Sequence, residues 1–117
     1  VPAAQRPPSA SSTPAPRQLS RPLKDPLVRD ALFRRERGRC FYCLRRLRPG
    51  AWALDHVVPL VAGGDDSPSN AVACCHECNC AKGESSARDF LRTLFRQAAL
   101  SRSELRSRGA ALKAIQK

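Results

Sequence analysis

Long apolar runs and acidic residues are what this sequence has least of. No segment approaches the roughly 20 consecutive apolar residues that a transmembrane helix needs, and residues 1–26 lack the apolar core of a secretory signal. Only 10 Asp and Glu stand against 21 Lys and Arg, for a formal net charge of +11. So large a basic excess in a small domain indicates a polyanionic partner, with nucleic acid first and an anionic membrane surface as the alternative.

Aromatic residues are also scarce, at 5% of the chain. No stretch combines a basic helical face with a bulky aromatic one, which is the pattern of helices that lie on membranes. We therefore expect no membrane partner. The single Trp, Trp52, falls in a predicted strand and is expected to pack in the core rather than to stack on a base.

The first 24 residues contain no acid and are rich in Pro, Ala and Ser. This composition cannot bury apolar surface, so we expect a disordered tail over residues 1–24 ahead of one folded domain over residues 25–117. Because the chain begins at Val1 and has no Met, we expect it to be a processed or excised piece of a longer product. A cytoplasmic location of the bacterial or phage-like kind is expected, with organelle targeting as the alternative suggested by the acid-free tail.

Six cysteines could form the disulfide framework of a small secreted protein. The missing secretory signal disfavours that reading, and four of the cysteines form two Cys-x-x-Cys pairs. Two such turns can place four thiolates around a tetrahedral zinc ion, which stabilises domains too small for a large core. The predicted ligands of a structural Zn²⁺ are Cys40, Cys43, Cys75 and Cys78. Cys74 and Cys80 are surplus, and the alternative is that one of them replaces a predicted ligand.

Capping residues and hydrophobic periodicity predict a small α+β domain. Asp25-Pro26 begins a helix over residues 27–37, which Gly38 ends. The β-forming segments that follow are residues 44–47, residues 51–57 and residues 71–74, and the first two flank a turn at residues 48–50.

The second half of the sequence is predicted to be mainly helical. A short helix is expected over residues 76–82. Ser86 and Ser101 are each followed three residues later by an acidic residue, a pattern that begins two further helices. The domain then has a core over residues 38–84 and C-terminal helices over residues 86–116.

The residues between the two cysteine pairs suit phosphodiester cleavage. This reaction needs an activated water and a cation that stabilises charge on the phosphate and on the leaving oxygen. A hard divalent ion prefers oxygen ligands, which Asp55 and Asn79 offer, and a neutral His56 can take a proton from water. Because neighbouring strand residues point to opposite faces, Asp55 and His56 can share a site only if the strand ends or bulges there.

Five elements follow one another in an order typical of one nuclease family. They are Cys40-Phe41-Tyr42-Cys43, Leu54-Asp55-His56-Val57-Val58-Pro59-Leu60, Gly63-Gly64, Asn70, and the run from Cys75 to Gly83. Over roughly residues 27–97 the chain resembles the HNH endonucleases, and within them the zinc-containing branch that has four cysteines. The resemblance implies a ββα-metal finger stapled by the zinc site, flanked by an N-terminal helix and one or two C-terminal helices.

The resemblance also implies a role for each site residue. His56 is the general base, and Asp55 and Asn79 are ligands of a catalytic divalent cation, Mg²⁺ or Mn²⁺. Asn70 braces the loop and orients His56. An amide oxygen at position 79 favours these two ions over transition metals that prefer nitrogen.

Arginines cluster before, within and after the predicted finger, where they are expected to contact the DNA backbone. The expected DNA-binding residues are Arg45, Arg46, Lys82, Arg88, Arg92 and Arg96. Together these features predict a metal-dependent DNA endonuclease of low intrinsic sequence specificity, which nicks or cuts both strands. The alternative is a catalytically inactive zinc-knuckle module that binds nucleic acid. The oligomeric state stays open.

Overall fold

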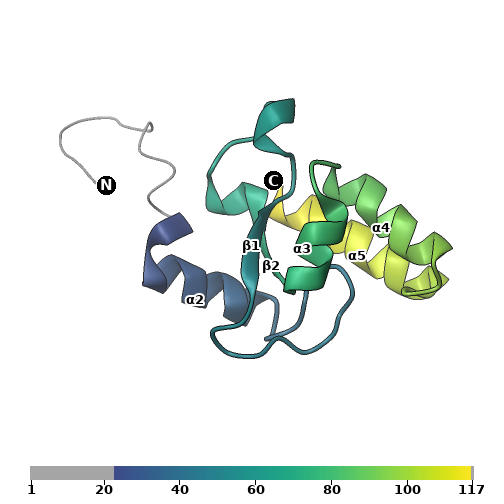
Figure 1. Cartoon of the computed structure of the whole chain (residues 1–117), viewed down its shortest axis with the longest axis horizontal. Coiled ribbons are helices and arrows are strands. Elements are labelled where there is room, and N and C mark those ends of the chain that lie inside the picture. Colours follow the sequence, from purple (N-terminus) through teal and green to yellow (C-terminus); the bar gives the residue numbers. More distant parts are fainter. Residues whose placement is uncertain (1–22, 117) are drawn as a thin grey trace.

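The computed structural model describes residues 23–116, so the tail predicted over residues 1–24 lies almost wholly outside the described residues. A two-stranded antiparallel sheet stands at the centre, with helices on either side of it (Figure 1). In chain order the elements are α2 (Pro26–Arg35), β1 (Ala53–His56), β2 (Ala71–Cys74), α3 (His76–Lys82), α4 (Ala87–Arg96) and α5 (Arg102–Ile115). Two single 3₁₀ turns, Leu60–Ala62 and Pro68–Asn70, lie in the loop between the strands. The predicted α+β class is confirmed.

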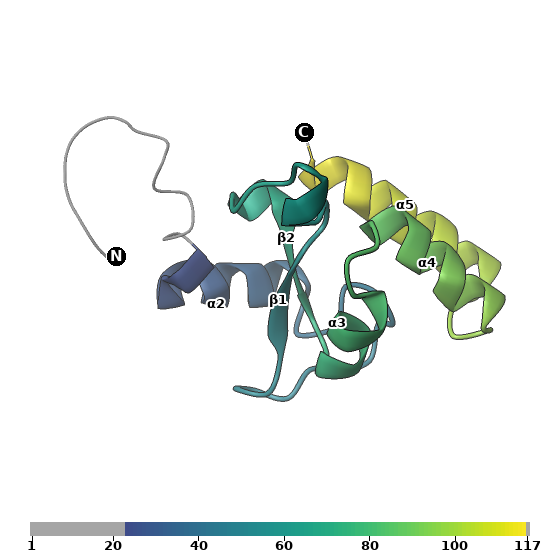
Figure 2. The same ribbon diagram turned by 45° about the horizontal axis from the view of Figure 1, so that its top comes forward.

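The two strands and α3 form a ββα unit. The strands pair in a register that runs from Ala53 opposite Cys74 to His56 opposite Ala71. Helix α3 packs against β1, whereas α2 packs against β2 (Figure 2). Helices α4 and α5 pack on each other at one end of the molecule, and this gives the two C-terminal helices that the sequence predicts.

The first predicted pair of strands is the largest error of the sequence-based description. Residues 44–47 form no strand, and β1 is limited to Ala53–His56 within the predicted 51–57. The segment before it folds back on itself instead, because the Leu47 amide donates to the carbonyl of Gly38 at 2.7 Å. The ladder of β1 ends where its partner does, since β2 has only four residues.

The predicted helix caps are confirmed in detail. The Asp25 side chain accepts from the Leu27 amide at 2.9 Å and begins α2. The Ser86 side chain caps α4, and Ser101 forms a reciprocal capping box with Glu104 at the start of α5. Helix α2 ends two residues earlier than predicted, because both Arg37 and Gly38 adopt left-handed conformations.

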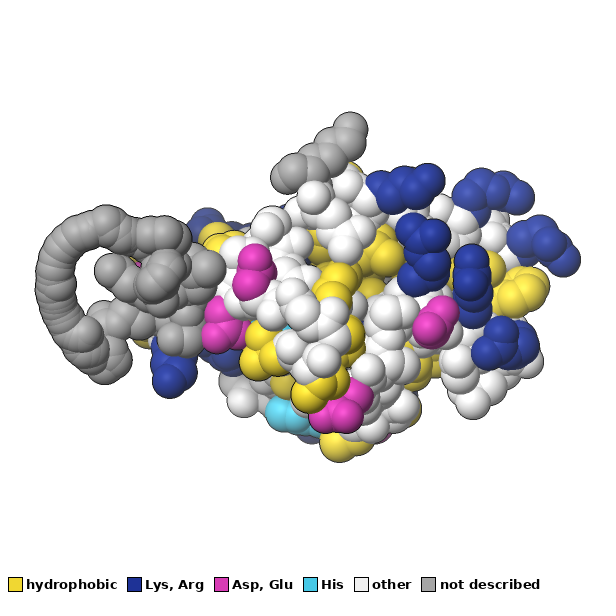
Figure 3. Space-filling model, turned by 90° about the horizontal axis from the view of Figure 1, so that it is seen from above, with side chains coloured by type: hydrophobic (Ala, Val, Ile, Leu, Met, Phe, Trp, Pro, Cys, Tyr) yellow, Lys and Arg dark blue, Asp and Glu magenta, His cyan; other side chains and the backbone are white. Residues whose placement is uncertain are grey.

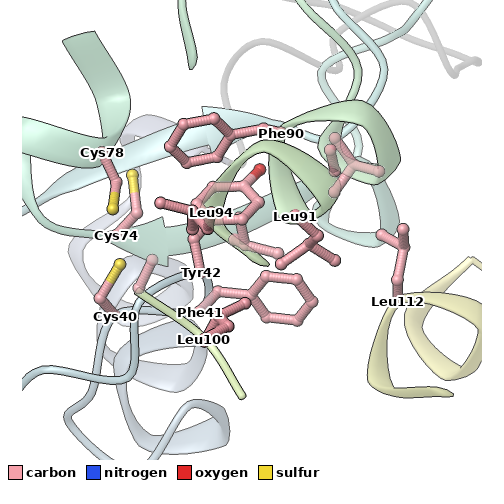
Figure 4. Packing of buried hydrophobic residues seen from close by; sticks show 14 of the residues in the cluster. Cys40, Phe41, Tyr42, Cys74, Cys78, Phe90, Leu91, Leu94, Leu100 and Leu112 are labelled. Carbon is pink, nitrogen blue, oxygen red and sulfur yellow. The ribbon is translucent and has the colours of Figure 1, made fainter. Parts of the chain in front are cut away.

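The hydrophobic core joins the first cysteine pair to α4 and α5. The ring of Tyr42 packs edge-on against Phe41 and against Phe90, at centroid distances of 5.3 and 5.2 Å. Leu91 of α4 and Leu112 of α5 are buried beside them (Figure 4). This packing fixes the C-terminal helices to the finger, and the Ala87 amide ties α4 to the end of β1 by donating to the Val57 carbonyl at 3.0 Å. Among the described helices, none has the length and apolar character needed to span a bilayer.

Candidate functional site

The four cysteines of the two Cys-x-x-Cys pairs come together at one end of the sheet. Their sulfur atoms all lie within 4.8 Å of one another, and the Cys43 and Cys75 sulfurs are 3.9 Å apart. Tetrahedral zinc with bonds of about 2.3 Å places its sulfur ligands about 3.8 Å apart, so the spacing fits that ion. In each pair the amide of the second cysteine donates to the sulfur of the first at 3.4 Å. The donor set can therefore bind zinc.

The electrostatics of this cluster favour thiolate sulfur. Hydrogen bonds from the Cys40 and Cys78 thiols hold the pKa of Cys43 far below its usual range, and the Arg45 guanidinium adds to the effect. The same shared protons raise the pKa of Cys40 to about 11. A cation in the cluster would replace these protons, because zinc binds cysteine as thiolate.

Arg45 belongs to this cluster as well as to the surface. Its Nε donates to the Cys43 sulfur at 3.4 Å, while the side chain stays exposed. Hydrogen bonds to ligand atoms orient metal sites and tune them. Arg45 was expected only to contact DNA, and its contact with the sulfur cluster is an additional role.

The two surplus cysteines have different surroundings. Cys74 is fully buried in the core beside Cys40 and Cys78 (Figure 4), and burial raises its pKa, so it stays a neutral thiol. Cys80 is exposed on α3. Within residues 23–116, neither is a member of the group whose sulfurs all lie within 4.8 Å. The arrangement favours the predicted ligand set over one that includes Cys74 or Cys80.

Asp55 lies at the opposite end of β1, in a buried polar network. Its Oδ2 accepts from the Tyr42 hydroxyl at 2.5 Å and lies 3.1 Å from Nζ of Lys82, and only 7% of the residue is exposed. Burial raises the pKa of Tyr42, and the nearby charge of Asp55 raises it further. The phenol therefore stays protonated and donates a hydrogen bond to Asp55. The ammonium and the phenol both donate to the carboxylate of Asp55.

Lys82 is buried, which corrects the expectation that it contacts phosphate. Its side chain is only 1% exposed, and its Nζ donates to Asp55 and, at 2.9 Å, to the carbonyl of His56. Burial of an unpaired ammonium is strongly unfavourable. The buried position of Lys82 could therefore not be predicted without knowing that Asp55 is its partner. Lys82 clamps the end of α3 to the end of β1.

His56 points away from Asp55 and towards the loop between the strands. Its Nε2 lies 2.5 Å from Oδ1 of Asp66, and the two side chains are 30% and 26% exposed. Both residues are paired in the ladder of β1, which has no bulge there, so their side chains point to opposite faces as in an ordinary strand. The structure places the carboxylate of Asp55 on the buried side and the imidazole at the surface.

Asn70 braces the loop that carries Asp66. Its amide oxygen accepts from the Val58 amide at 2.9 Å, and its amide nitrogen donates to the carbonyls of Val58 and Asp65 at 3.0 and 2.8 Å. Gly64 passes so close that a Cβ atom there would lie 1.8 Å from the Val58 carbonyl oxygen. Every polar group of the Asn70 amide thus holds this loop in place.

Asn79 lies on α3, three residues before Lys82. Residues at this spacing are neighbours on one face of a helix, and Lys82 reaches Asp55 from that face. The Asn79 side chain is partly exposed. A carboxylate and an amide oxygen are ligands that Mg²⁺ accepts, and that ion usually has only one or two protein ligands beside water and phosphate. The donor chemistry at this end of the sheet fits such an ion.

The predicted basic residues of α4 lie on a cationic surface that the sequence analysis described only in part. Arg88, Arg92 and Arg96 are exposed, as is Arg46. Arg88 and Arg92 line a groove of about 440 Å³ between α4 and α5, together with Arg106 and Lys113 of α5. Figure 3 shows Lys and Arg side chains gathered at this end of the molecule. Among the described residues that line the groove, none is acidic.

Two residues of the site were missed in the sequence, Tyr42 and Asp66. Tyr42 lies inside the first cysteine pair, 13 residues before the carboxylate that it contacts. Asp66 directly follows Asp65, and their positions in the sequence do not show which of the two acids contacts His56. Asp65 bonds to Ser67 instead, at 2.7 Å to its hydroxyl. A pair of acids in a loop after a Gly-Gly turn was the only available signal.

Comparison with known proteins agrees with the geometry. Residues 40–95 match the family model described as HNH endonuclease. The match begins at the first zinc-cluster cysteine, extends into α4, and contains the sulfur cluster, Asp55, His56 and the braced loop. A search of curated proteins finds no match. Over these residues the chain is similar to the HNH endonuclease family.

Proposed function

We propose that this protein is a metal-dependent endonuclease that hydrolyses phosphodiester bonds of DNA, with low intrinsic sequence specificity. The observation that carries the proposal is the end of β1. There a buried, charge-stabilised carboxylate and a surface imidazole stand on adjacent residues, Asp55 and His56, inside the HNH match. Neither group is a member of the sulfur cluster.

His56 takes a proton from the attacking water in this proposal. Its side chain is partly exposed, so water and a phosphate can reach it. Asp55 and Asn79 hold the divalent cation, Mg²⁺ or Mn²⁺, with water and the phosphate as the remaining ligands. When bound, that ion stabilises negative charge on the phosphate and on the leaving oxygen.

Tyr42 and Lys82 hold Asp55 in one position for this task. A carboxylate has about four lone-pair directions, and the two partners leave some of them free for a cation. Hydrogen-bonded partners of this kind orient ligand groups in metal sites. Lys82 also donates to the carbonyl of His56, and this bond holds the backbone of His56 in place.

The sulfur cluster holds a structural Zn²⁺ in this proposal. Three of its features support that role: the spacing of the sulfurs, the amide hydrogen bonds to them, and the lowered pKa of Cys43. All four coordination positions are filled by protein sulfur, as in structural rather than catalytic zinc sites. We propose that residues 25–117 form one folded unit around this ion.

The DNA backbone lies across the groove between α4 and α5. Four cations line the groove, and phosphates are the ligands that such a surface attracts without regard to sequence. Arg96 and Arg46 extend the cationic surface beyond the groove. The other functional class consistent with this surface is a module that binds nucleic acid without cleaving it.

Cleavage assays on several substrates distinguish an endonuclease from a module that only binds nucleic acid. Zinc-loaded protein is incubated with supercoiled plasmid, linear duplex, single-stranded DNA and RNA, with Mg²⁺, with Mn²⁺, or with chelator. We expect cleavage of DNA that needs added Mg²⁺ or Mn²⁺ and shows no strong site preference. Binding in every condition, with no cleavage in any, would identify the protein as a binding module.

A further inference from the structure

We propose that Asp66 is a positioning residue for His56: it fixes the imidazole as the Nε2–H tautomer and leaves Nδ1 as the nitrogen that takes the proton from water. The inference rests on the proposed function for its catalytic part, whereas the tautomer itself is a property of the folded chain. The contact that carries it is the 2.5 Å distance between Nε2 of His56 and Oδ1 of Asp66.

The chemistry of the two groups sets the direction of this hydrogen bond. An ionised carboxylate only accepts, and a neutral imidazole has one donor nitrogen and one acceptor nitrogen. Nε2 must therefore carry the hydrogen, and the lone pair is on Nδ1. In serine proteases an aspartate selects the tautomer of the catalytic histidine in the same way and stabilises the imidazolium that forms.

Both ends of the contact are held by other interactions. On one side the loop is fixed by Asn70, which bonds to Asp65 and Val58, and by the close passage of Gly64. On the other side Lys82 holds the carbonyl of His56. Asp66 therefore contacts the imidazole from a loop that other interactions hold in place, whereas a carboxylate on an unconstrained surface loop would have no fixed position.

Asp65 cannot take the place of its neighbour. Its carboxylate accepts from the amide and the hydroxyl of Ser67, at 3.1 and 2.7 Å. Those bonds hold the pKa of Asp65 below its usual value, with a smaller contribution from the nearby His56. The two adjacent acids therefore have separate tasks: Asp65 shapes the loop, and Asp66 faces the imidazole.

In the reaction, one proton passes from water to Nδ1 of His56 and makes the ring an imidazolium. The oxygen of that water bonds to phosphorus as the bond from phosphorus to the leaving oxygen breaks, and the leaving oxygen takes a proton from solvent. Asp66 stays ionised throughout, and its charge stabilises the imidazolium. Because the positive ring forms only as the reaction proceeds, this contact lowers the barrier more than it aids DNA binding.

Histidine NMR tests the tautomer without any assay of cleavage. The chain has only two histidines, His56 and His76, so their ring nitrogens can be assigned with one substitution each. At a pH where the rings are neutral, we expect His56 to be mainly the Nε2–H tautomer in the parent protein. Asp66→Asn should shift His56 towards Nδ1–H, because an amide can donate to Nε2. Asp65→Asn is the matched control and should leave the ring unchanged, as should His76 in every variant.

Cleavage kinetics test the role of the contact. Asp66→Asn should lower kcat for plasmid cleavage by at least about 10-fold and by no more than the roughly 10²–10⁴-fold that a general base supplies. Its KM for plasmid should be unchanged. In a His56→Ala background, Asp66→Asn should cause no further loss, since both changes remove the same step.

The outcomes are distinguishable. If the parent shows the Nε2–H tautomer and Asp66→Asn shifts it, but no protein cleaves DNA, the positioning contact stands and the proposed function is wrong. If the parent cleaves, and Asp66→Asn changes neither the tautomer nor kcat, then Asp66 is an ordinary surface carboxylate and the inference is overturned. If Asp65→Asn has the larger effect, the assignment of the two acids is wrong.

Discussion

The two ends of the small sheet differ in the chemistry that they bring together. Where Ala53 pairs with Cys74, the chain continues into Cys75 and the sulfur cluster. Where His56 pairs with Ala71, the chain leads from His56 into a loop of oxygen donors that ends at Asn70. Soft thiolates favour zinc, and carboxylate and amide oxygens favour Mg²⁺ or Mn²⁺. In the proposed function, the four residue pairs of one ladder separate two metal chemistries.

The comparison also separates stability from activity. The sulfur end has no open position for a substrate, because all four cysteines face one another. The oxygen end has one buried group and one accessible group on successive residues. Substitutions at the first end should therefore unfold the protein. At the second end, substitutions of the accessible group should change the reaction alone, and those of the buried group should change both stability and the reaction.

The largest effect is expected from Cys43→Ser. Structural zinc supplies about 10–16 kcal/mol in small metal-dependent domains, far more than a chain of this size can lose. The variant should lose zinc and its cooperative thermal transition together, as measured by metal analysis and calorimetry. Cys80→Ser is the matched control, since the Cys80 thiol lies outside the cluster, and it should keep both. Stoichiometric zinc in Cys43→Ser would show that the ligand set is wrong.

Asp55→Asn should have the next largest effect, on stability and on cleavage at once. It leaves the Lys82 ammonium buried without a counter-charge, which typically costs about 3–5 kcal/mol. Asp55→Asn combined with Lys82→Met removes both charges and should recover most of that stability, as measured by denaturant unfolding. The double variant should still fail to cleave plasmid in Mg²⁺.

Recovery of cleavage in that double variant would contradict the assignment of Asp55 as a ligand of the divalent cation. It would instead mean that Asp55 and Lys82 serve only as a structural pair. Lys82→Met alone, which leaves a buried carboxylate unpaired, completes the cycle and gives the coupling energy of the pair.

Gly64→Ala tests the braced loop and should have a moderate effect. The added methyl would meet the Val58 carbonyl oxygen at 1.8 Å and the Asn70 amide nitrogen at 2.8 Å. Relief of such a clash costs roughly 1–3 kcal/mol, and the displaced loop should also slow cleavage. Gly109→Ala on α5 is the control: nothing lies within 4 Å of the new atom, and the helix should gain up to about 1 kcal/mol. An equal melting temperature for Gly64→Ala and the parent would show that the loop is not tightly held.

The smallest expected effect belongs to the cationic groove, and it appears in the salt dependence of binding. Each phosphate contact that is lost reduces the slope of log affinity against log salt by ~0.9. Replacing Arg88, Arg92, Arg106 and Lys113 with Gln should flatten that slope by about two to four such steps, equally for unrelated DNA sequences. Replacing Lys24, Arg34, Arg37 and Arg39 with Gln removes the same charge from the cluster that precedes the finger, and this variant should flatten the slope less. A groove variant that flattens the slope no more than this one would show that the groove is not the main DNA contact.

Local patterns predicted much of this molecule. The strand at Ala71–Cys74, the helix at His76–Lys82 and the serine caps of α4 and α5 were predicted at their observed positions. Each is determined by residues within a few positions of itself. The four cysteines were also identified, because two short spacings encode the cluster.

Contacts between distant residues could not be predicted in the same way. The network of Tyr42, Asp55 and Lys82 joins three elements, and nothing in the spacing of these residues signals that a lysine is buried there. The wrong strand at 44–47 has the same cause, because the chain folds back there and the Leu47 amide donates to the carbonyl of Gly38, nine residues earlier. Arg106 and Lys113 of α5 line the cationic groove because α4 and α5 pack against each other, and this packing could not be predicted from the sequence.

The separation of the two ends is tested most directly by His56→Ala beside His76→Ala. For each protein, zinc content, melting temperature, DNA affinity and plasmid cleavage in Mg²⁺ are measured on one preparation. We predict that His56→Ala loses at least about 10²-fold in cleavage, the lower bound for a general base, with the other three quantities unchanged, and that His76→Ala cleaves at the parental rate. Cleavage by His56→Ala at the parental rate would contradict the account, because the oxygen end of the sheet would then not be the catalytic end. Loss of zinc by His56→Ala would also contradict it, because the two ends would then not be separate.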